Sequence, residues 1–184
     1  FSLMFVNVVV FIVIYLQVNS FAEPAWSFHL LKQGAEFNPY TLDGEWYRIF
    51  THMFLHGNIV HILLNMYALY SVGMEVESET GTKKFLWVYF LSGIAAALAS
   101  LYWSLFSIGV GASGAILGLF GFSLILSLVR NRKEGHSITP ILINFGIFLA
   151  INLYFAKAFK ADTAAHLGGL AGGVILGFLS SLSS

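Results

Sequence analysis

Two residues of the sequence carry the chemistry of an activated nucleophile. Ser113 lies in the uncharged, glycine-rich run Gly109–Ala115, and His166 stands at the start of the last apolar stretch. A serine hydroxyl is a poor nucleophile until a nearby base takes its proton, and histidine titrates near neutral pH and can later protonate a leaving amine. The pair suits acyl transfer, with Ser113 as nucleophile and His166 as general base. Asp162 is the only acidic residue near either of them in the sequence, which favours a Ser–His dyad over a triad.

A second pair, His61 and Asn65, supplies hydrogen-bond donors. The two residues are four positions apart, so on a helix they share one face. Acyl transfer needs donors where negative charge develops on the tetrahedral intermediate, and an amide, a histidine ring and backbone N–H groups near Ser113 can provide them. A helix that begins at Ser113 adds a favourable dipole. We therefore predict an oxyanion site formed by His61, Asn65 and the Ser113 N–H.

Simpler explanations exist for each of these residues taken alone. A glycine-flanked serine is common where membrane helices pack, and Asn65 fits a packing amide. His61 fits a hydrogen bond between helices, and His166 fits an interfacial side chain. The histidines also raise the question of a metal, but they lack a companion carboxylate and the H-E-x-x-H pattern, and the chain has no cysteine. We therefore expect no metal and no cofactor. Convergence of a serine, two histidines and an asparagine at one depth is harder to explain by packing alone, and it favours catalysis.

The composition indicates what must position these residues. Of the 184 residues, 58% are hydrophobic and 10% are charged, whereas soluble domains carry about a quarter charged residues. Nine basic and nine acidic residues give a net charge of zero, so nothing favours nucleic-acid binding. The length suits one domain, residues 1–184. The chain is therefore predicted to be a single, multi-pass domain in the lipid bilayer.

Stretches without charge predict the membrane spans. No Asp, Glu, Lys or Arg occurs in residues 1–22, 49–74, 85–129, 135–156 or 163–184. Four of these stretches have the length of one span, and 85–129 suits two spans joined around Gly109 and Gly111. Backbone groups in hydrocarbon need internal partners, and these runs lack barrel-strand alternation, so we expect six transmembrane helices. The first stretch also fits a secretory signal ending near Ala22, but it has no basic segment, so we favour a span.

The segments between the spans set the topology. Residues 19–57 contain several aromatic residues and read as a long, partly interfacial loop. The turns near Lys83 and near Arg130 carry basic residues and are assigned to the cytoplasmic side by the positive-inside rule. We expect a protein of the plasma or inner cell membrane, with the long loop on the outer side.

Small residues recur at four-residue intervals and predict how Ser113 meets His166. Such ridges let two helix backbones approach closely. The members are Gly169, Gly173 and Gly177 in the last stretch, with Gly114 and Gly118 in the stretch that follows Ser113. Both stretches start from the outer side and run parallel, so close packing brings Ser113 and His166 to the same depth.

Three motifs together resemble the rhomboid family of intramembrane serine proteases. They are H-x-x-x-N (His61, Asn65), G-x-S-G (Gly111 to Gly114) and A-H-x-x-G-x-x-x-G (Ala165, His166, Gly169, Gly173). The resemblance implies that Ser113 is the nucleophile, His166 the base, and His61, Asn65 and the Ser113 N–H the oxyanion site. It also implies a six-helix core, a first outer loop half-embedded in the membrane, water access from outside, and transmembrane helices as substrates. His52 and His56 match family histidines that are structural or line the cavity.

Two positions depart from the family pattern. Where relatives often have Trp-Arg in the first loop, this chain has Tyr47-Arg48, which keeps an interfacial aromatic residue. Four residues after the serine, many relatives carry an aromatic residue beside the base histidine, and this chain has Leu117, which puts the catalytic rate in question.

Two other functional classes remain as alternatives to proteolysis. A rhomboid-like protein that binds transmembrane segments without cleaving them typically lacks one of the serine–histidine pair, whereas both are present here. A channel or transporter is suggested only by polar residues within spans, and the paired interrupted helices common in transporters are missing from the sequence. The sequence does not reveal the oligomeric state, the natural substrate or its cleavage site.

Overall fold

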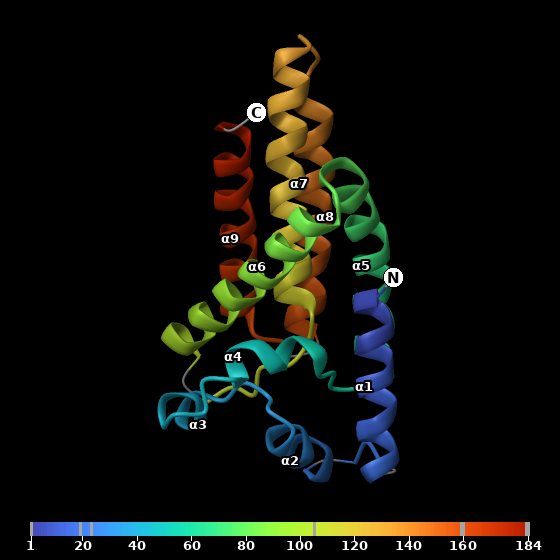
Figure 1. Ribbon diagram of the computed structural model, residues 1–184, viewed down its shortest axis with the longest axis vertical. Coiled ribbons are helices and arrows are strands. Elements are labelled where there is room, and N and C mark those ends of the chain that lie inside the picture. Colours follow the sequence, from blue (N-terminus) through green and yellow to red (C-terminus); the bar gives the residue numbers. More distant parts are fainter. Residues whose placement is uncertain (1, 19, 23, 105, 159–160, 183–184) are drawn as a thin grey trace.

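The chain folds into helices joined by short turns and one long loop. The computed structural model describes residues 2–18, 20–22, 24–104, 106–158 and 161–182. Its helices are α1 (Ser2–Val18), α2 (Ala25–Lys32), α3 (Asn38–Leu42), α4 (Arg48–Thr51), the 3₁₀ turn η1 (His52–Phe54), α5 (Ile59–Thr80), α6 (Thr82–Trp103), α7 (Ser113–Lys133), α8 (Thr139–Ala158) and α9 (Thr163–Leu182). The long helices form a bundle, and α2 to η1 lie together at one end of it (Figure 1). The prediction of an all-α protein is confirmed for the described residues.

Four of the described helices are long and apolar enough to cross a membrane: α5, α6, α7 and α9. Helix α1 has 17 residues, and the apolar part of α8 ends at Tyr154, so both fall below that length. Four residues at predicted boundaries lie outside the described part of the chain. They are Phe1 at the start of the first uncharged stretch, Asn19 at the start of the long loop, and Ser183 and Ser184 at the end of the last stretch.

The second long helix begins just after residues 19–57, which were predicted to form the long loop, and not at the start of the uncharged stretch 49–74. Residues 49–58 form the end of α4, the turn η1 and an extended connection, and α5 begins only at Ile59. The Asn58 side chain accepts a hydrogen bond from the His61 N–H at 2.9 Å, which caps the helix there. At its other end α5 runs past residue 74 to Thr80 and stops at Gly81, whose φ of +83° suits glycine. Absence of charge therefore marked an apolar region but not the helix boundaries.

Helices α7 and α9 pack backbone against backbone. A Cβ atom built on Gly169 would overlap the carbonyl group of Gly114, and one on Gly173 would overlap that of Gly118. The contacts advance by four residues in both helices in the same direction, so the helices run parallel. Only glycine allows this approach, and it brings the first turns of α7 and α9 side by side.

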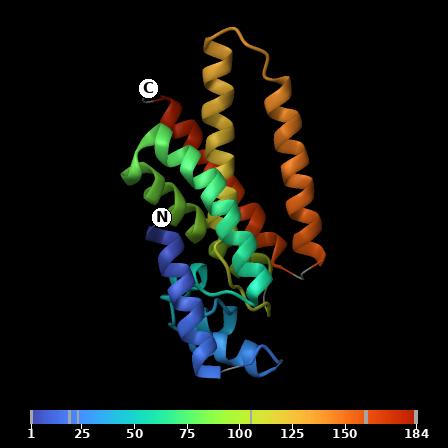
Figure 2. The same cartoon turned by 90° about the vertical axis from the view of Figure 1, so that its right-hand side faces the viewer.

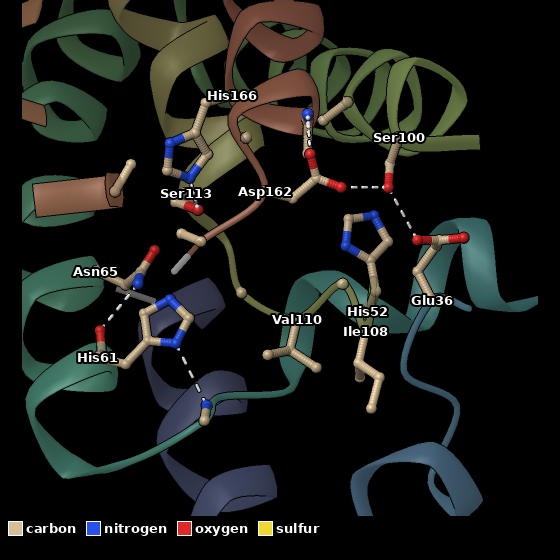
Figure 3. A pocket seen from close by; sticks show the side chains of 18 of the residues that line it. Glu36, His52, His61, Asn65, Ser100, Ile108, Val110, Ser113, Asp162 and His166 are labelled. Atoms are coloured by element: carbon tan, nitrogen blue, oxygen red, sulfur yellow. Dashed lines mark hydrogen bonds between the residues drawn. The ribbon is translucent and has the colours of Figure 1, made fainter. Parts of the chain in front are cut away.

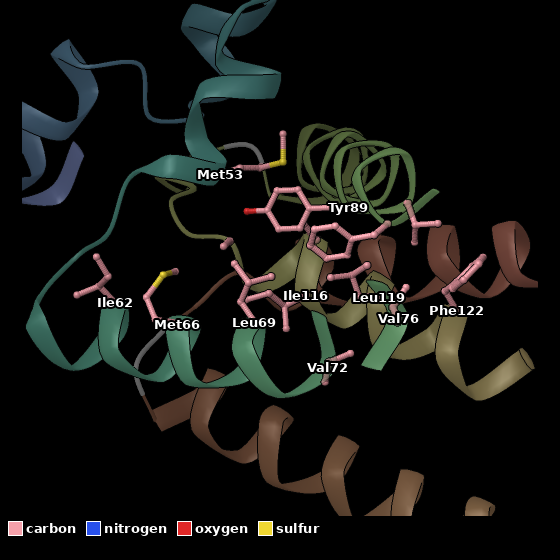
Figure 4. Close-up of a cluster of buried hydrophobic side chains, with 14 residues drawn as sticks. Met53, Ile62, Met66, Leu69, Val72, Val76, Tyr89, Ile116, Leu119 and Phe122 are labelled. Atoms are coloured by element: carbon pink, nitrogen blue, oxygen red, sulfur yellow. The ribbon is translucent and has the colours of Figure 1, made fainter. Parts of the chain in front are cut away.

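Apolar side chains from α5, α6 and α7 fill the space beside this helix pair (Figure 4). Tyr89 of α6 and Leu119 of α7 are fully buried there, and Met53 of η1 closes the end nearest the loop. Met53 also packs against α6 at Gly93, where a Cβ would overlap its sulfur. This core therefore fixes the long loop to the bundle as well as the helices to one another.

The buried guanidinium of Arg48 organises the long loop. It donates hydrogen bonds to the carbonyl oxygens of Leu31 at 2.7 Å and Ala35 at 2.6 Å, and it pairs with Glu45 at 2.6 Å. These bonds connect α4 to the end of α2. A separate apolar cluster that includes Ile14 and Trp26 packs the loop against α1. The loop is thus a folded unit rather than a flexible connection.

Helix α8 is the long helix least closely packed against the bundle (Figure 2). Phe120 of α7 contacts it through the rings of Phe145 and Phe148, with ring centroids 5.2 and 3.7 Å away. Gly146, which follows Phe145, has no atom within 4 Å of the position a Cβ would occupy.

The close contact between α7 and α9 predicts that a Gly→Ala substitution lowers the Tm at Gly173 but not at Gly146. Gly173→Ala should force α7 and α9 apart and lower the Tm in detergent by roughly 3–10 °C, because overpacking costs about 1–3 kcal/mol. Gly146→Ala is the matched control: it should leave the Tm unchanged or raise it, since alanine favours helix by about 1 kcal/mol. Equal Tm values for Gly173→Ala and the unmodified chain would contradict the close approach.

Candidate active site

The starts of α7 and α9 bring Ser113 and His166 together. Ser113 is the first residue of α7, and His166 lies in the first turn of α9. The Ser113 Oγ is 2.7 Å from His166 Nε2, a hydrogen-bond distance (Figure 3). His166 is buried and Ser113 is partly exposed. This arrangement allows the imidazole to accept the serine proton while the hydroxyl oxygen remains accessible.

Gly111 shapes the turn before Ser113. Its φ is +118°, and its N–H donates to the carbonyl oxygen of His52 at 2.9 Å. A Cβ at this position would lie 2.7 Å from His61 Nε2. A side chain here would therefore strain the backbone and collide with the His61 ring, so both features require glycine.

His61 is held in the tautomer that donates from Nε2. The Gly57 N–H lies 3.3 Å from His61 Nδ1, which must then be the acceptor nitrogen. The ring proton consequently resides on Nε2. This atom faces Gly111 in the turn that precedes Ser113, which is called the serine turn below.

Asn65 adds a second donor on the same helix face. Its Nδ2 donates one hydrogen to the His61 carbonyl oxygen at 2.8 Å, which orients the amide and leaves its other hydrogen for a ligand. The backbone N–H groups in the first turn of α7, including that of Ser113, have no acceptor within the helix. Donors from α5 and α7 therefore converge on the space beside Ser113 Oγ.

A cavity of about 260 Å³ lies over these groups. Ser113, His166, His61 and Asn65 line one part of its wall. Glu36 and the other polar groups discussed below line another part. The cavity gives a ligand direct access to the serine hydroxyl and to the donors around it.

His52 and His56 have different positions relative to this cavity. His52 lines it, whereas His56 is fully buried, with its ring centroid 5.2 Å from that of His61. Burial lowers the pKa of His52 to about 4 and the pKa of His56 to about 3, so both rings are neutral at physiological pH. Within the described part of the chain, no three His, Asp or Glu side chains are grouped to hold a metal ion.

Asp162 does not hydrogen-bond to the His166 ring. His166 Nδ1 has no hydrogen-bond partner, and Nε2 faces Ser113. The Asp162 carboxylate instead accepts the N–H groups of Ala164 at 2.9 Å and Ala165 at 3.1 Å, which caps α9. Burial opposes its ionisation, but hydrogen bonds from Ser100, the Ala165 N–H and two further serines outweigh burial and hold its pKa below the usual value.

Sequence reasoning did not single out Glu36 or Ser100, which also line the cavity. Glu36 is one of several acidic residues in the long loop, and no local pattern separates it from the exposed Asp43. Ser100 lies within an apolar helix, where serine is a common packing residue. Only the folding of the loop over α6 reveals that the two side chains meet.

Leu117, the residue that departs from the family pattern, lies one turn after Ser113 on α7. Its side chain is buried. The imidazole of His166 is therefore oriented by its bond to Ser113 and by packing of α9, because Nδ1 has no partner to fix the ring.

Comparison with known proteins identifies one family and several relatives. The family profile described as "Rhomboid domain" matches residues 43–183. The chain is 39% identical over 145 residues to "Rhomboid protease GluP" of Bacillus subtilis, covering 78% of this chain and 28% of that protein. It is 33% identical over 196 residues to "Rhomboid protease AarA" of Providencia stuartii, covering 94% of this chain and 68% of that protein. The chain therefore spans less than a third of the first relative and about two thirds of the second.

The 2.7 Å contact predicts that Ser113 reacts with a fluorophosphonate probe. Labelling should disappear in Ser113→Ala, because the nucleophilic oxygen is gone, and should be slower by about 10²-fold or more in His166→Ala, because no base remains. The measurement is in-gel fluorescence of the purified protein in detergent, with the labelled peptide identified by mass spectrometry. Labelling that persists in Ser113→Ala would contradict the assignment.

Proposed function

Because the chain belongs to the rhomboid family, we propose that it is an intramembrane serine endopeptidase that cleaves transmembrane segments with a Ser113–His166 dyad. The observation that carries this proposal is the 2.7 Å contact between Ser113 Oγ and His166 Nε2, beside donors from His61 and Asn65. The names of the similar proteins describe rhomboid proteases and favour the same chemistry.

The first step forms an acyl-enzyme. His166 Nε2 takes the proton from Ser113 Oγ as the oxygen attacks the carbonyl carbon of the scissile peptide bond. The resulting imidazolium then gives that proton to the departing amine as the C–N bond breaks. Asp162 does not contact the imidazole ring, so the proposed mechanism needs a dyad and no third member.

The oxyanion is the charge that the surrounding groups must stabilise. The proposed donors are His61 Nε2–H, the free hydrogen of the Asn65 amide and the Ser113 backbone N–H. They come from two helices whose geometry is set before substrate binds, so little reorganisation is needed as the charge develops. The N-terminal end of α7 adds its positive dipole.

The second step hydrolyses the acyl-enzyme. A water molecule gives a proton to His166 Nε2 and attacks the acyl carbon, and the proton returns to Ser113 Oγ as the C–O bond breaks. Water must reach a site that lies close to the apolar bundle, and the polar lining of the cavity supports its entry. The proposed route is from the outer side, where the long loop lies.

The proposed substrates are single transmembrane helices. A peptide carbonyl within a helix is hydrogen-bonded and shielded, so the substrate must unwind locally before Ser113 can attack. Gly, Pro or polar residues in the substrate span would favour that unwinding, and a small residue is expected before the cut.

The proposed membrane arrangement has six spans within one domain. Helix α1, with 17 residues, is about 25 Å long, close to the hydrocarbon thickness of about 30 Å. Together with α8 it would complete the six spans begun by α5, α6, α7 and α9. Exposed aromatic residues on the long loop, such as Trp46 and Tyr47, suit partial immersion in the interface of a plasma or inner membrane.

The test is cleavage of a model transmembrane substrate by the purified protein in liposomes. The expected result is a single cut within or next to the substrate span that is lost in Ser113→Ala. Binding of the substrate without any cleavage would instead favour a rhomboid-like protein that only escorts transmembrane segments.

The oxyanion assignment predicts the behaviour of Asn65→Ala. Removing this donor should lower kcat by about 10- to 1,000-fold with little change in KM, because the lost interaction acts in the transition state. Asn7→Ala is the matched control, because Asn7 is also a buried amide whose Nδ2 donates to the carbonyl four residues earlier. It should keep kcat per folded molecule even if the Tm falls. An unchanged kcat in folded Asn65→Ala would show that Asn65 contributes to helix packing and not to stabilising the oxyanion.

A further inference from the structure

Two carboxyl groups meet through one serine hydroxyl next to the dyad. Ser100 Oγ of α6 lies 2.5 Å from Asp162 Oδ2 and 3.0 Å from Glu36 Oε2. Dashed lines in Figure 3 join Ser100 to both carboxyl groups. This set, Glu36, Ser100 and Asp162, is called the acid bridge below. Neither the motifs nor the proposed mechanism uses Glu36 or Ser100.

The number of hydrogens available for donation determines which carboxyl group in the acid bridge is protonated. Ser100 has a single hydroxyl hydrogen and can donate to only one of the two carboxyl groups. Asp162 is the acceptor because its two oxygens also receive the α9 N–H groups and the hydroxyls of Ser104 and Ser107. Glu36 is 1% exposed and its Oε1 has no partner, so an ionised Glu36 would be buried with no donor. A neutral Glu36 solves this by donating its own O–H to Ser100 Oγ.

The electrostatic surroundings of Glu36 also favour its neutral form. Burial raises its pKa to about 7; Ser100 and the positive charge of Arg48 lower it, and the negative charge of Asp162 raises it. The titratable group drawn beside the acid bridge in Figure 3 is His52, which is neutral because burial lowers its pKa to about 4. The cavity's other histidines, His61 and His166, line the part of the wall around Ser113. Glu36 therefore changes its charge near neutral pH, whereas Asp162 stays ionised.

The acid bridge joins the two chain segments that carry the dyad. The backbone of Glu36 pairs with Gly109 in both directions, at 2.9 and 2.8 Å, and Gly109 leads through Gly111 into Ser113. At the other end, Asp162 caps α9 one turn before His166. These hydrogen bonds link the residues that lead into Ser113, through the long loop and α6, to the start of α9. The contact between Ser113 and His166 closes the ring.

We propose that Glu36 and Asp162 are positioning residues that, through Ser100, fix the distance between Ser113 and His166. This inference rests on the proposed Ser113–His166 chemistry. Neither carboxyl group touches the reacting atoms; each acts on the backbone segment that carries one member of the dyad. An opened bridge would leave the substrate site intact but misalign the nucleophile and the base, so the effect belongs in kcat rather than KM.

Glu36→Gln provides the main test because its amide can donate to Ser100 Oγ at every pH. Below about pH 7 the unmodified chain and Glu36→Gln should have similar kcat values. As the pH rises through about 7, Glu36 ionises and the native bridge opens, so the ratio of kcat for Glu36→Gln to kcat for the unmodified chain should rise about 3- to 10-fold by about pH 9. Titration of His166 affects both proteins and cancels in the ratio.

The thermal stability of the protein should also depend on the ionisation of Glu36. Because folding raises the pKa of Glu36 from 4.5 to about 7, its stabilisation is complete below about pH 4.5 and is lost as the pH rises through about 7. The Tm of the unmodified chain should therefore fall relative to that of Glu36→Gln over this range. Glu79→Gln is the control, because Glu79 pairs with Arg130 at the other end of the bundle, and its kcat ratio should not vary with pH.

Two further variants separate positioning from general loss of structure. Glu36→Ala and Ser100→Ala each remove one link, and both should lower kcat about 10- to 100-fold at about pH 6 with KM unchanged, since a shift of about 1 Å can cost a hundredfold in rate. Ser100→Ala keeps a good helix former in α6 and is the variant to use if Glu36→Ala does not fold.

The outcomes distinguish this inference from the proposed function. If fluorophosphonate labels Ser113 in the unmodified chain and the kcat ratio rises with pH, the inference is supported. If the probe labels Ser113 but the ratio stays flat and Ser100→Ala keeps full kcat, the acid bridge is structural only and the inference is wrong. If the unmodified chain is neither labelled nor active, the proposed function fails and the inference fails with it.

Discussion

The close approach of α7 and α9 is the constraint on which the site depends. Gly169 and Gly173 let the two helix backbones touch, because a Cβ on either would overlap the facing carbonyl group of Gly114 or Gly118. A Cβ on Gly114 or Gly118 would instead overlap a side chain of α6, that of Ala96 or Ser92. Lipid tails are as apolar as the side chains of the helices, so hydrophobic burial gives little reason for two membrane helices to associate. Close backbone packing supplies that reason here, and it also puts Ser113 and His166 within one hydrogen bond of each other.

A polar site inside an apolar bundle must satisfy its own hydrogen-bonding groups, and the long loop does much of that work. The His52 carbonyl accepts the Gly111 N–H, and Glu36 pairs with Gly109, so the serine turn is held by the loop rather than by its own helix. The loop is held in turn by the buried guanidinium of Arg48. Unpaired polar groups are costly in such surroundings, so each bond restricts the turn to one conformation.

The two acidic residues near the cavity differ because their surroundings differ. Asp162 sits at a helix N-terminus among hydroxyl donors, which suits a negative charge. Glu36 is buried with one hydroxyl partner and a second acid beyond it, which suits a neutral carboxyl group. In the proposed mechanism these two acids therefore act on the backbone segments that carry Ser113 and His166, and not on the imidazole ring itself.

The helical fold, the apolar regions and the candidate site residues could be predicted from local patterns of amino acids. Periodic glycines, a capped helix start or a His-x-x-x-Asn spacing are properties of neighbouring residues, so they can be read locally. The meeting of Glu36 with Ser100 and Asp162, by contrast, depends on how the folded chain packs. Those contacts join segments more than 50 residues apart, and their formation depends on how the loop packs over α6, for which no local pattern exists. The physical reason is that helix formation is mostly a local property, whereas the pairing of buried polar groups depends on the packing of the whole chain.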